Sequence, residues 1–276
     1  MSNDALLPVL ERIANALERV SPVVSKTADL AEGPAFYWNG VSAKKIGAFV
    51  PVALNLLSGI DKQKAKLLEN SERHAKGLPS HDILLWGSRG MGKSASVKSV
   101  ASALMENGHD IALIEASADH LDSLPQLFSL LSDYKRRFII FIDDIGFDDE
   151  SSAPRMLRSM LEGGASARPD NARLYVTSNR RHIVARNLNE QNDPINPRDV
   201  VDDKLALSDR FGLRLGFHAA TQDDYLDMVA GYAARYGLDL DLADALLWAT
   251  QRGSRSGRVA WQYIMELAGR AGKTLK

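Results

Sequence analysis

One glycine-rich segment constrains the fold of this chain more than any other feature. Residues 87–94 read GSRGMGKS and match the pattern G-x-x-x-x-G-K-[ST] at every required position. The apolar run DILLW at 82–86 precedes the segment, and apolar residues at helical spacing follow it from 95 to 106. A strand, a glycine loop and a helix in this order are typical of a phosphate-binding loop. We expect contacts with a bound nucleotide from Ser88, Arg89, Gly90, Met91, Gly92, Lys93, Ser94 and Ala95.

The residue types in this segment suit phosphate chemistry. Glycines let the backbone wrap closely around phosphate oxygens, and the N-terminus of the following helix adds partial positive charge. Lys93 is a point charge for the β- and γ-phosphates, and the hydroxyl of Ser94 can bind Mg²⁺. The alternative is a chance glycine-rich turn, which the preceding strand and the following helix disfavour.

Two carboxylates follow the most apolar strand pattern in the chain, RFIIFIDD at 137–144. Unbroken apolar runs are typical of strands buried on both faces of a parallel sheet, and ligands bind at the carboxyl ends of such strands. Asp143 is therefore expected to hold Mg²⁺, through a water, and Asp144 to act as the general base that polarises the attacking water. The alternative is a polar strand end that caps a turn.

The order of the patterns predicts the fold class. Apolar strand patterns alternate with helical patterns from residue 82 to residue 217, and only helical patterns follow from Thr221, which with Asp224 forms a capping-box-like start. This order predicts a parallel α/β sheet followed by a small helical lid domain. The expected divisions are an N-terminal amphipathic helix and linker at 1–33, an α/β nucleotide-binding core at 34–219 and the lid at 220–276.

Three segments outside these patterns give weaker predictions. The N-terminal helix, over residues 6–17, either packs on its own domain or contacts a partner. Residues 34–50 have a mixed pattern that predicts an irregular arm, and the polar stretch 186–206 predicts a long loop of the kind that is usually functional or mobile.

Composition excludes several classes of site. The chain has no cysteine, so disulfides, cysteine-bound zinc and thiol nucleophiles are excluded, and its six histidines include no i,i+4 pair. A formal charge of −1 argues against strong non-specific nucleic-acid binding by the whole chain. The start has no basic region before a long apolar run, and no window reaches the ~20 apolar residues of a membrane span, so a cytoplasmic protein without a membrane partner is expected.

The motifs together resemble those of the AAA+ ATPases. After the phosphate loop and IIFIDD come VTSN at 176–179, LSDRFGL at 207–213 and GSRSGR at 253–258. The resemblance implies that Asn179 is a polar sensor that orients water, that Arg210 reaches into a neighbouring subunit's site, and that Arg258 is the second sensor. It also implies that residues 57–63, with Ile60, contact the adenine. The alternatives are a turn cap for Asn179, an intrachain ion pair for Arg210, a contact with only its own helix or the main sheet for Arg258, and Arg255 as the second sensor.

The chain is similar to one bacterial AAA+ family over longer stretches, including GLPSHDILLWGSRGMGKS, FIDDIGF and RSGRVAWQ. That family is catalogued as a domain of unknown function, and it is itself similar to helicase-loader ATPases. This resemblance, over about residues 36–270, implies a homo-oligomer, a ring or a spiral, that hydrolyses ATP to ADP with Mg²⁺ and acts on an unidentified protein client.

Two other functions stay open at this point. Many relatives carry Glu where this chain has Asp144, which favours a nucleotide-dependent adaptor or loader with little hydrolysis. A DNA-associated ATPase is the third hypothesis, because residues 180–186 are basic although the net charge argues against it.

Overall fold

The computed structural model describes residues 8–9, 12–13, 27–146, 153–161, 168–179 and 207–275. Several predicted features lie outside these residues. They are most of the N-terminal helix, the basic residues 180–186 and the predicted loop at 186–206.

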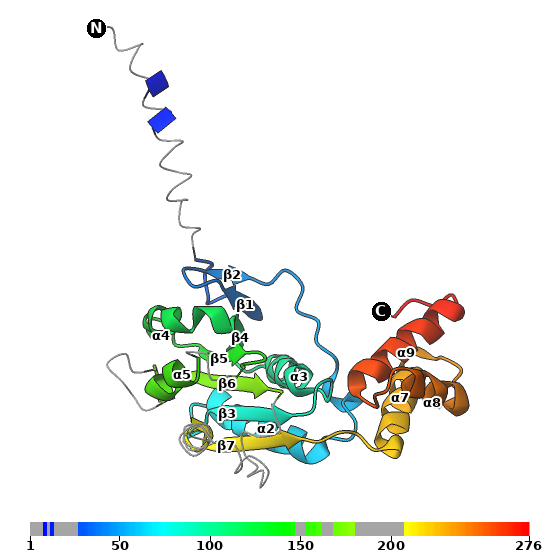
Figure 1. The fold of residues 1–276 in the computed structure, drawn as a ribbon. Coiled ribbons are helices and arrows are strands. Elements are labelled where there is room, and N and C mark those ends of the chain that lie inside the picture. The colour runs from blue at the N-terminus through cyan, green and yellow to red at the C-terminus, as the bar shows by residue number, and fades with distance from the viewer. Residues whose placement is uncertain are drawn as a thin grey trace, which may run out of the picture.

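The described strands form one seven-stranded sheet in the order β2-β1-β4-β5-β6-β3-β7, which Figure 1 shows as a stack running from β2 to β7. The strands are β1 (Ala35–Trp38), β2 (Ala43–Lys45), β3 (Ile83–Gly87), β4 (Ile111–Ala116), β5 (Arg137–Ile142), β6 (Ala172–Ser178) and β7 (Leu213–Phe217). Only the β1–β2 pair is antiparallel among these strands. The prediction of a parallel α/β sheet is thus confirmed, and the strand that carries the phosphate loop, β3, lies between β6 and β7.

The prediction of an irregular arm over residues 34–50 is wrong for residues 35–45, where the chain forms β1 and β2. Phe36 and Trp38 are buried and Tyr37 between them is 40% exposed, so β1 has the alternation of a half-buried strand. Four residues are too few for that alternation to stand out in a sequence. The register is fixed by pairing with β4, where Phe36 lies opposite Ile114, and by a 2.8 Å bond from the indole of Trp38 to Ser123.

Helices cover both faces of the sheet (Figure 1). They are α2 (Asp61–Ala75), α3 (Lys93–Glu106), α4 (Leu124–Ser132) and α5 (Ala153–Leu161), with short 3₁₀ helices η1 (Leu54–Leu56) and η2 (Ala118–Ser123). Helix α4 follows η2 directly, and its first turn contains Pro125. Proline there costs no helical hydrogen bond, because the first N–H groups of a helix have no partner within it.

The core has a layer on each face of the sheet, and β3 contributes to both. Ile83 and Leu85 belong to the layer with α2 and α3, whereas Leu84 between them belongs to the layer with α4 and α5. All three side chains have no exposed surface. Burial on both faces is the reason why these strands read as continuous apolar runs.

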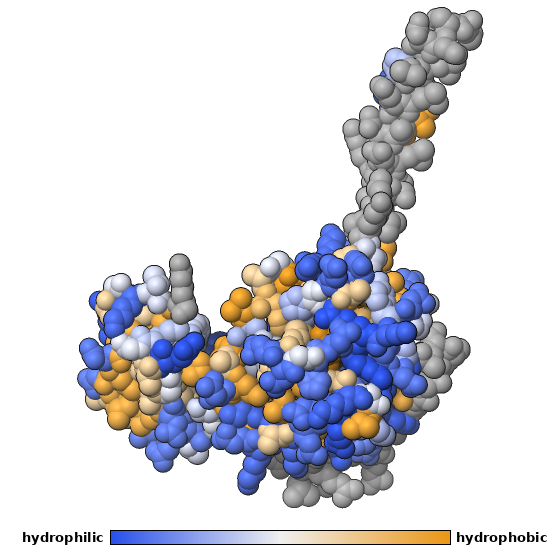
Figure 2. Space-filling model, turned by 180° about the vertical axis from the view of Figure 1, so that it is seen from behind, coloured by the Kyte–Doolittle hydropathy of each residue, from blue (hydrophilic) through white to orange (hydrophobic). Residues whose placement is uncertain are grey.

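The C-terminal helices are α7 (Gln222–Tyr236), α8 (Leu242–Gln251) and α9 (Gly257–Arg270). They pack on one another and form a lobe beside the sheet, with hydrophobic side chains on its surface (Figures 1 and 2). The predicted capping box at the start of α7 is confirmed, since Thr221 and Asp224 bond reciprocally.

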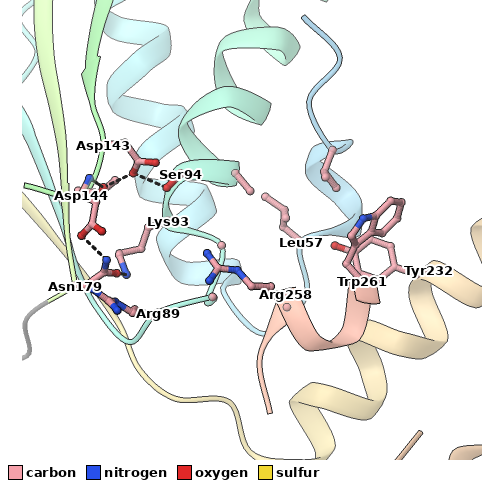
Figure 3. Close-up of a pocket in the computed structure, with 16 residues that line it drawn as sticks. Leu57, Arg89, Lys93, Ser94, Asp143, Asp144, Asn179, Tyr232, Arg258 and Trp261 are labelled. Atoms are coloured by element: carbon pink, nitrogen blue, oxygen red, sulfur yellow. Dashed lines mark hydrogen bonds between the residues drawn. The ribbon is translucent and has the colours of Figure 1, made fainter. Parts of the chain in front are cut away.

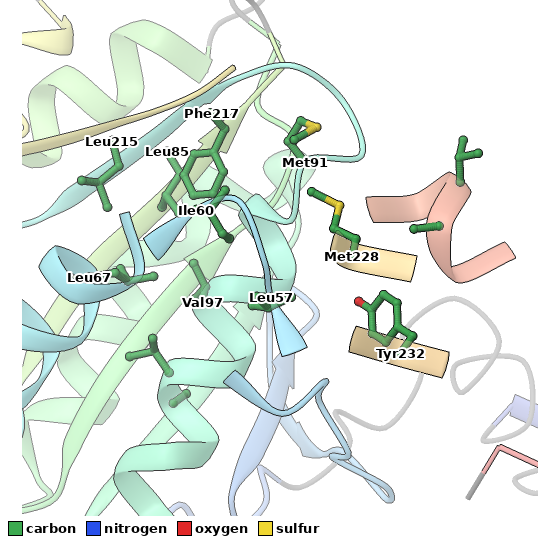
Figure 4. Packing of buried hydrophobic residues seen from close by; sticks show 14 of the residues in the cluster. Leu57, Ile60, Leu67, Leu85, Met91, Val97, Leu215, Phe217, Met228 and Tyr232 are labelled. Carbon is green, nitrogen blue, oxygen red and sulfur yellow. The ribbon is translucent and has the colours of Figure 1, made fainter. Parts of the chain in front are cut away.

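The lobe shares a continuous apolar cluster with the α2–α3 side of the sheet. Figure 4 shows Leu57 and Met91 of the sheet region facing Met228 and Tyr232 of α7. None of the helices in the described part of the chain is long and apolar enough to cross a membrane.

Candidate nucleotide-binding site

The glycine loop between β3 and α3 has a backbone path that side chains would obstruct. Gly87, Gly90 and Gly92 have φ angles of 121°, 74° and 85°, in the left-handed region that favours glycine. A Cβ on Gly87 would lie 2.1 Å from the carbonyl oxygen of Phe217, and the N–H of Ser88 donates to that same oxygen at 2.8 Å. The loop is therefore closed against the end of β7, and α3 begins directly after it.

Lys93 is the buried cation of this loop, with 6% of its surface exposed. Its Nζ donates to the carbonyl oxygens of Gly87 at 3.0 Å and Ser88 at 2.9 Å, and to Oδ1 of Asn179 at 2.9 Å. The amide nitrogen of Asn179 in turn donates to the carboxylate of Asp144. The structure thus brings together three residues that the sequence predicted from motifs far apart in the chain (Figure 3).

The charges around Lys93 act in opposite directions. Burial lowers the pKa of Lys93, the carboxylates of Asp144 and Asp143 raise it, and the cations Arg89 and Arg258 lower it further. Since Arg89 and Arg258 also line the pocket, the site concentrates positive charge where an anion would be favoured.

Ser94 and Asp143 have the oxygen ligands that a hard cation prefers. The hydroxyl of Ser94 donates to Oδ1 of Asp143 at 2.6 Å, so both oxygens already converge on one point. Mg²⁺ is commonly held by one or two protein oxygens, with waters and substrate phosphates completing its coordination. The described residues contain no group of three or more His, Cys, Asp or Glu side chains fit to hold a metal ion. The oxygens of Ser94 and Asp143 fit Mg²⁺ that is bound together with a nucleotide.

A pocket of about 490 Å³ contains these groups. Its polar side is formed by the glycine loop, the two aspartates and Asn179, and its other side by Leu57, Tyr232 and Trp261, with Arg258 between the two (Figure 3). Val52 also lines the pocket. The rings of Tyr232 and Trp261 meet edge to face, with centroids 5.3 Å apart. An apolar wall of this kind suits the flat face of a nucleobase.

Sequence reasoning missed Val52, Tyr232 and Trp261. They come from three separate parts of the chain, and no motif links them. Leu57 lies in the stretch that the resemblance assigned to adenine, but Ile60 is buried behind the loop, and a Cβ on Gly92 would be 3.5 Å from its Cδ1. Ile60, Ser88 and Met91 are not among the residues that line the pocket. Met91 is instead 5% exposed and packs in the core.

The two candidate second sensors differ in position. Both are exposed, but Arg258 lines the pocket and its backbone N–H lies 3.3 Å from the carbonyl oxygen of Gly90, whereas Arg255 does not line the pocket. Arg210 is also exposed and lies in the turn before β7, at the opposite end of that strand from the phosphate loop. It is not among the residues that line this chain's own pocket.

A protein-family model described as "Protein of unknown function (DUF815)" matches residues 31–271. The chain belongs to this family. The match confirms the predicted resemblance to an uncharacterised family. A comparison of the sequence with curated proteins gives no match.

Solved structures show the same fold as this DUF815 protein. The Thermotoga maritima RuvB Holliday junction branch migration motor is 18% identical, with a TM-score of 0.52 over 82% of this chain and 68% of that one. The Aeropyrum pernix Orc1 protein, solved in complex with DNA, is 16% identical, with a TM-score of 0.54 over 84% of this chain and 68% of that one. At such identities the likeness shows the fold alone, and that fold is the AAA+ fold expected from the sequence.

Proposed function

We propose that this protein binds ATP with Mg²⁺ and hydrolyses it as a subunit of a homo-oligomer. The observation that carries the proposal is the convergence of Lys93, Ser94, Asp143, Asp144 and Asn179 on one pocket whose far wall is apolar. The pocket volume of about 490 Å³ lies within the range typical of small-molecule sites. The family membership and the AAA+ fold support the same proposal.

Each polar group has a role in this proposal. The loop amides and Lys93 hold the phosphates, while Ser94 and Asp143 hold Mg²⁺, which when bound supplies positive charge against the triphosphate. Asp144 accepts a proton from the attacking water, and Asn179 orients that water. Phosphoryl transfer needs little covalent help from a protein, so positioning and charge neutralisation are sufficient.

Two arginines connect the site to larger movements. Arg258 belongs to α9, so a contact with the γ-phosphate would make the position of the helical lobe depend on the bound nucleotide. Arg210 is proposed to act in the pocket of a neighbouring subunit. Its exposure and its distance in the fold from its own glycine loop support that role. A head-to-tail contact of this kind closes into a ring or continues as a spiral.

Steady-state ATP turnover of the full chain tests the proposal. Lys93→Ala should lose nucleotide binding, whereas Arg210→Ala should keep ADP binding but lose about 10³-fold in turnover. A mixture of these two variants should regain part of the activity, because some interfaces then pair an intact loop with an intact Arg210. Arg235→Ala, at an exposed arginine of α7, is the matched control.

Two outcomes would contradict parts of the proposal. Normal turnover by Arg210→Ala at high protein concentration would exclude its action in a neighbouring site. A wild-type protein that takes up neither ATP nor ADP with ample Mg²⁺ would exclude nucleotide binding altogether.

A second candidate is a nucleotide-dependent adaptor or loader with little hydrolysis. It is favoured by the chain of bonds from Lys93 through Asn179 to Asp144, since the groups meant to act on phosphate and water are bonded to one another. Tight nucleotide binding with negligible turnover, even at high protein concentration, would support it. Association with DNA is a separate hypothesis, tested by binding to single and double strands at low salt, where affinity should fall steeply as salt rises.

A further inference from the structure

A threonine of β6 holds the strand end that carries both aspartates. Thr177 is 1% exposed, and its Oγ1 donates to Oδ1 of Asp143 at 2.5 Å while it accepts from the backbone N–H of Asp144 at 2.8 Å. The carbonyl oxygen of Thr177 accepts from the N–H of Ile145 at 2.9 Å. One residue thus binds three consecutive residues of the neighbouring chain segment.

The segment held in this way has an unfavourable backbone conformation. Asp144 has a φ angle of 53°, and it is the only non-glycine residue with positive φ in the described part of the chain. Residues with a Cβ are uncommon in this region, although Asp tolerates it better than most, so the surrounding contacts help to hold Asp144 there. The bond from its N–H to the Thr177 hydroxyl is one such contact, and the next residue, Ile145, is anchored in the core at 1% exposure.

We propose that Thr177 is a positioning residue for the Mg²⁺ and water chemistry of this site, an inference that rests on the proposed function. The hydroxyl of Ser94 would turn from Asp143 to the cation when nucleotide and Mg²⁺ bind. Thr177, which lies on a buried strand, would then still orient the carboxylate of Asp143. The same hydroxyl fixes the backbone of Asp144, and so the direction of its carboxylate. Partners that orient ligating carboxylates are commonly needed for metal affinity.

The competing account is that Thr177 only fills space in the sheet. Thr177→Val separates the two accounts, because valine has nearly the shape of threonine but neither donates to Asp143 nor accepts from Asp144. Thr177→Ser keeps the hydroxyl and loses the methyl group. Ser71→Ala is the matched control, since Ser71 on α2 has a fully buried hydroxyl bonded to Leu67 and Tyr175, far from the pocket.

The experiment measures the affinity of the full chain for a fluorescent non-hydrolysable ATP analogue, with excess Mg²⁺ and with EDTA. The ratio of the two affinities gives the contribution of Mg²⁺. We expect Thr177→Val to lower that ratio about tenfold or more while the affinity in EDTA is unchanged. Thr177→Ser should restore the ratio of the two affinities. Ser71→Ala should lower the midpoint of thermal unfolding but leave that ratio unchanged. In turnover assays, Thr177→Val should raise the Mg²⁺ concentration needed for half-maximal rate.

An unchanged ratio in Thr177→Val would overturn the inference and leave the proposed function intact. A wild-type ratio of one would contradict both the inference and the part of the proposed function that assigns Mg²⁺ to Ser94 and Asp143. Equal losses in Thr177→Val and Thr177→Ser, present also in EDTA, would assign Thr177 a merely structural role. A wild-type protein that binds no nucleotide would overturn the proposed function and this inference together.

Discussion

The surroundings of polar side chains differ between the two ends of the parallel strands. At the carboxyl end, Lys93, Asp143, Asp144 and Asn179 line an open pocket, where each is hydrogen-bonded to a neighbouring side chain. At the amino end, a group of polar side chains from α2 is enclosed in the core. Asn70 and Ser71 have no exposed surface, and His74 is 1% exposed.

The enclosed polar groups are bonded within the protein. The hydroxyl groups of Ser71 and Tyr175 lie 2.7 Å apart, and Oδ1 of Asn70 accepts from the N–H of His81 at 2.9 Å. Burial raises the pKa of the Tyr175 hydroxyl to about 12, which keeps it neutral. A buried polar network that is satisfied in this way specifies one packing arrangement.

The comparison shows that polar residues have different roles at the two ends of one sheet. At the amino end they are committed to one another, so changes there should alter stability. At the carboxyl end they surround a pocket, so changes there should alter binding. Four predictions test this division.

The largest expected effect is at the ion pair of Asp82 and Arg168. Asp82 also accepts from the backbone N–H of Leu174 at 2.7 Å, and the side chains of the pair are 10% and 20% exposed. Asp82→Ala leaves a mostly buried cation without its partner, which should lower the free energy of unfolding by about 3–5 kcal/mol. Urea unfolding measures the change, and nucleotide affinity at low temperature should be that of the wild type. A loss of affinity would contradict the division.

The next effect is a loss of stability in acid caused by His74. Burial lowers the pKa of His74 to about 4, and Arg173, Arg137 and Arg168 lower it too, while a bond to the carbonyl oxygen of Phe138 opposes the shift. The unfolded chain, with an ordinary His pKa of about 6.5, binds the proton first. Stability should therefore fall as pH drops from about 6.5 to about 4, by about 3 kcal/mol in total.

His74→Gln removes this titration and keeps an amide that can donate to Phe138. Urea unfolding at several pH values between 7 and 4 should give the variant a shallower loss of stability than the wild type. If the free energy of unfolding fell with the same slope against pH in both proteins, the loss of stability in acid could not be assigned to His74.

The third effect is on binding at the carboxyl end. Arg258→Gln removes a cation from the pocket, and the lost charged hydrogen bond to phosphate should cost about 1.5–3 kcal/mol, or about 10–100-fold in ATP affinity. The free energy of unfolding should not fall, because Arg89 and Lys93 then face less repulsion. Arg255→Gln, outside the pocket, is the control and should bind as the wild type does. The reverse result would make Arg255 the second sensor.

The smallest effect is at the place where the lobe meets the glycine loop. Ser256 caps α9, because its Oγ accepts a 3.3 Å bond from the N–H of Val259. The Oγ of Ser256 also lies close to the glycine loop, since a Cβ on Gly90 would be 2.9 Å from it. Ser256→Ala should cost about 1 kcal/mol of stability through the lost cap. Nucleotide affinity, measured alongside thermal unfolding, should hardly change. A tenfold loss of affinity would mean that this cap also controls how the lobe docks on the loop.

The elements of the fold were predictable where the sequence pattern is local and strong. The apolar strands β3 and β5 and the capped helix α7 were found, because burial on two faces and helix capping leave marks within a few residues. The hairpin of β1 and β2 was missed, since a four-residue strand carries too short a pattern and its pairing partner, β4, lies about 75 residues away in the chain.

The sequence by itself determined the glycine loop, Lys93, Ser94 and the two aspartates, because each follows a backbone requirement or a strand end that is visible locally. The tertiary structure decided which distant residues meet them. It set Tyr232 and Trp261 on the far wall, gave Arg258 rather than Arg255 a place in the pocket, and put Thr177 against the aspartates. These pairings depend on strand order and on how the lobe packs, and both are fixed by burial of apolar surface over the whole chain rather than by neighbours in sequence.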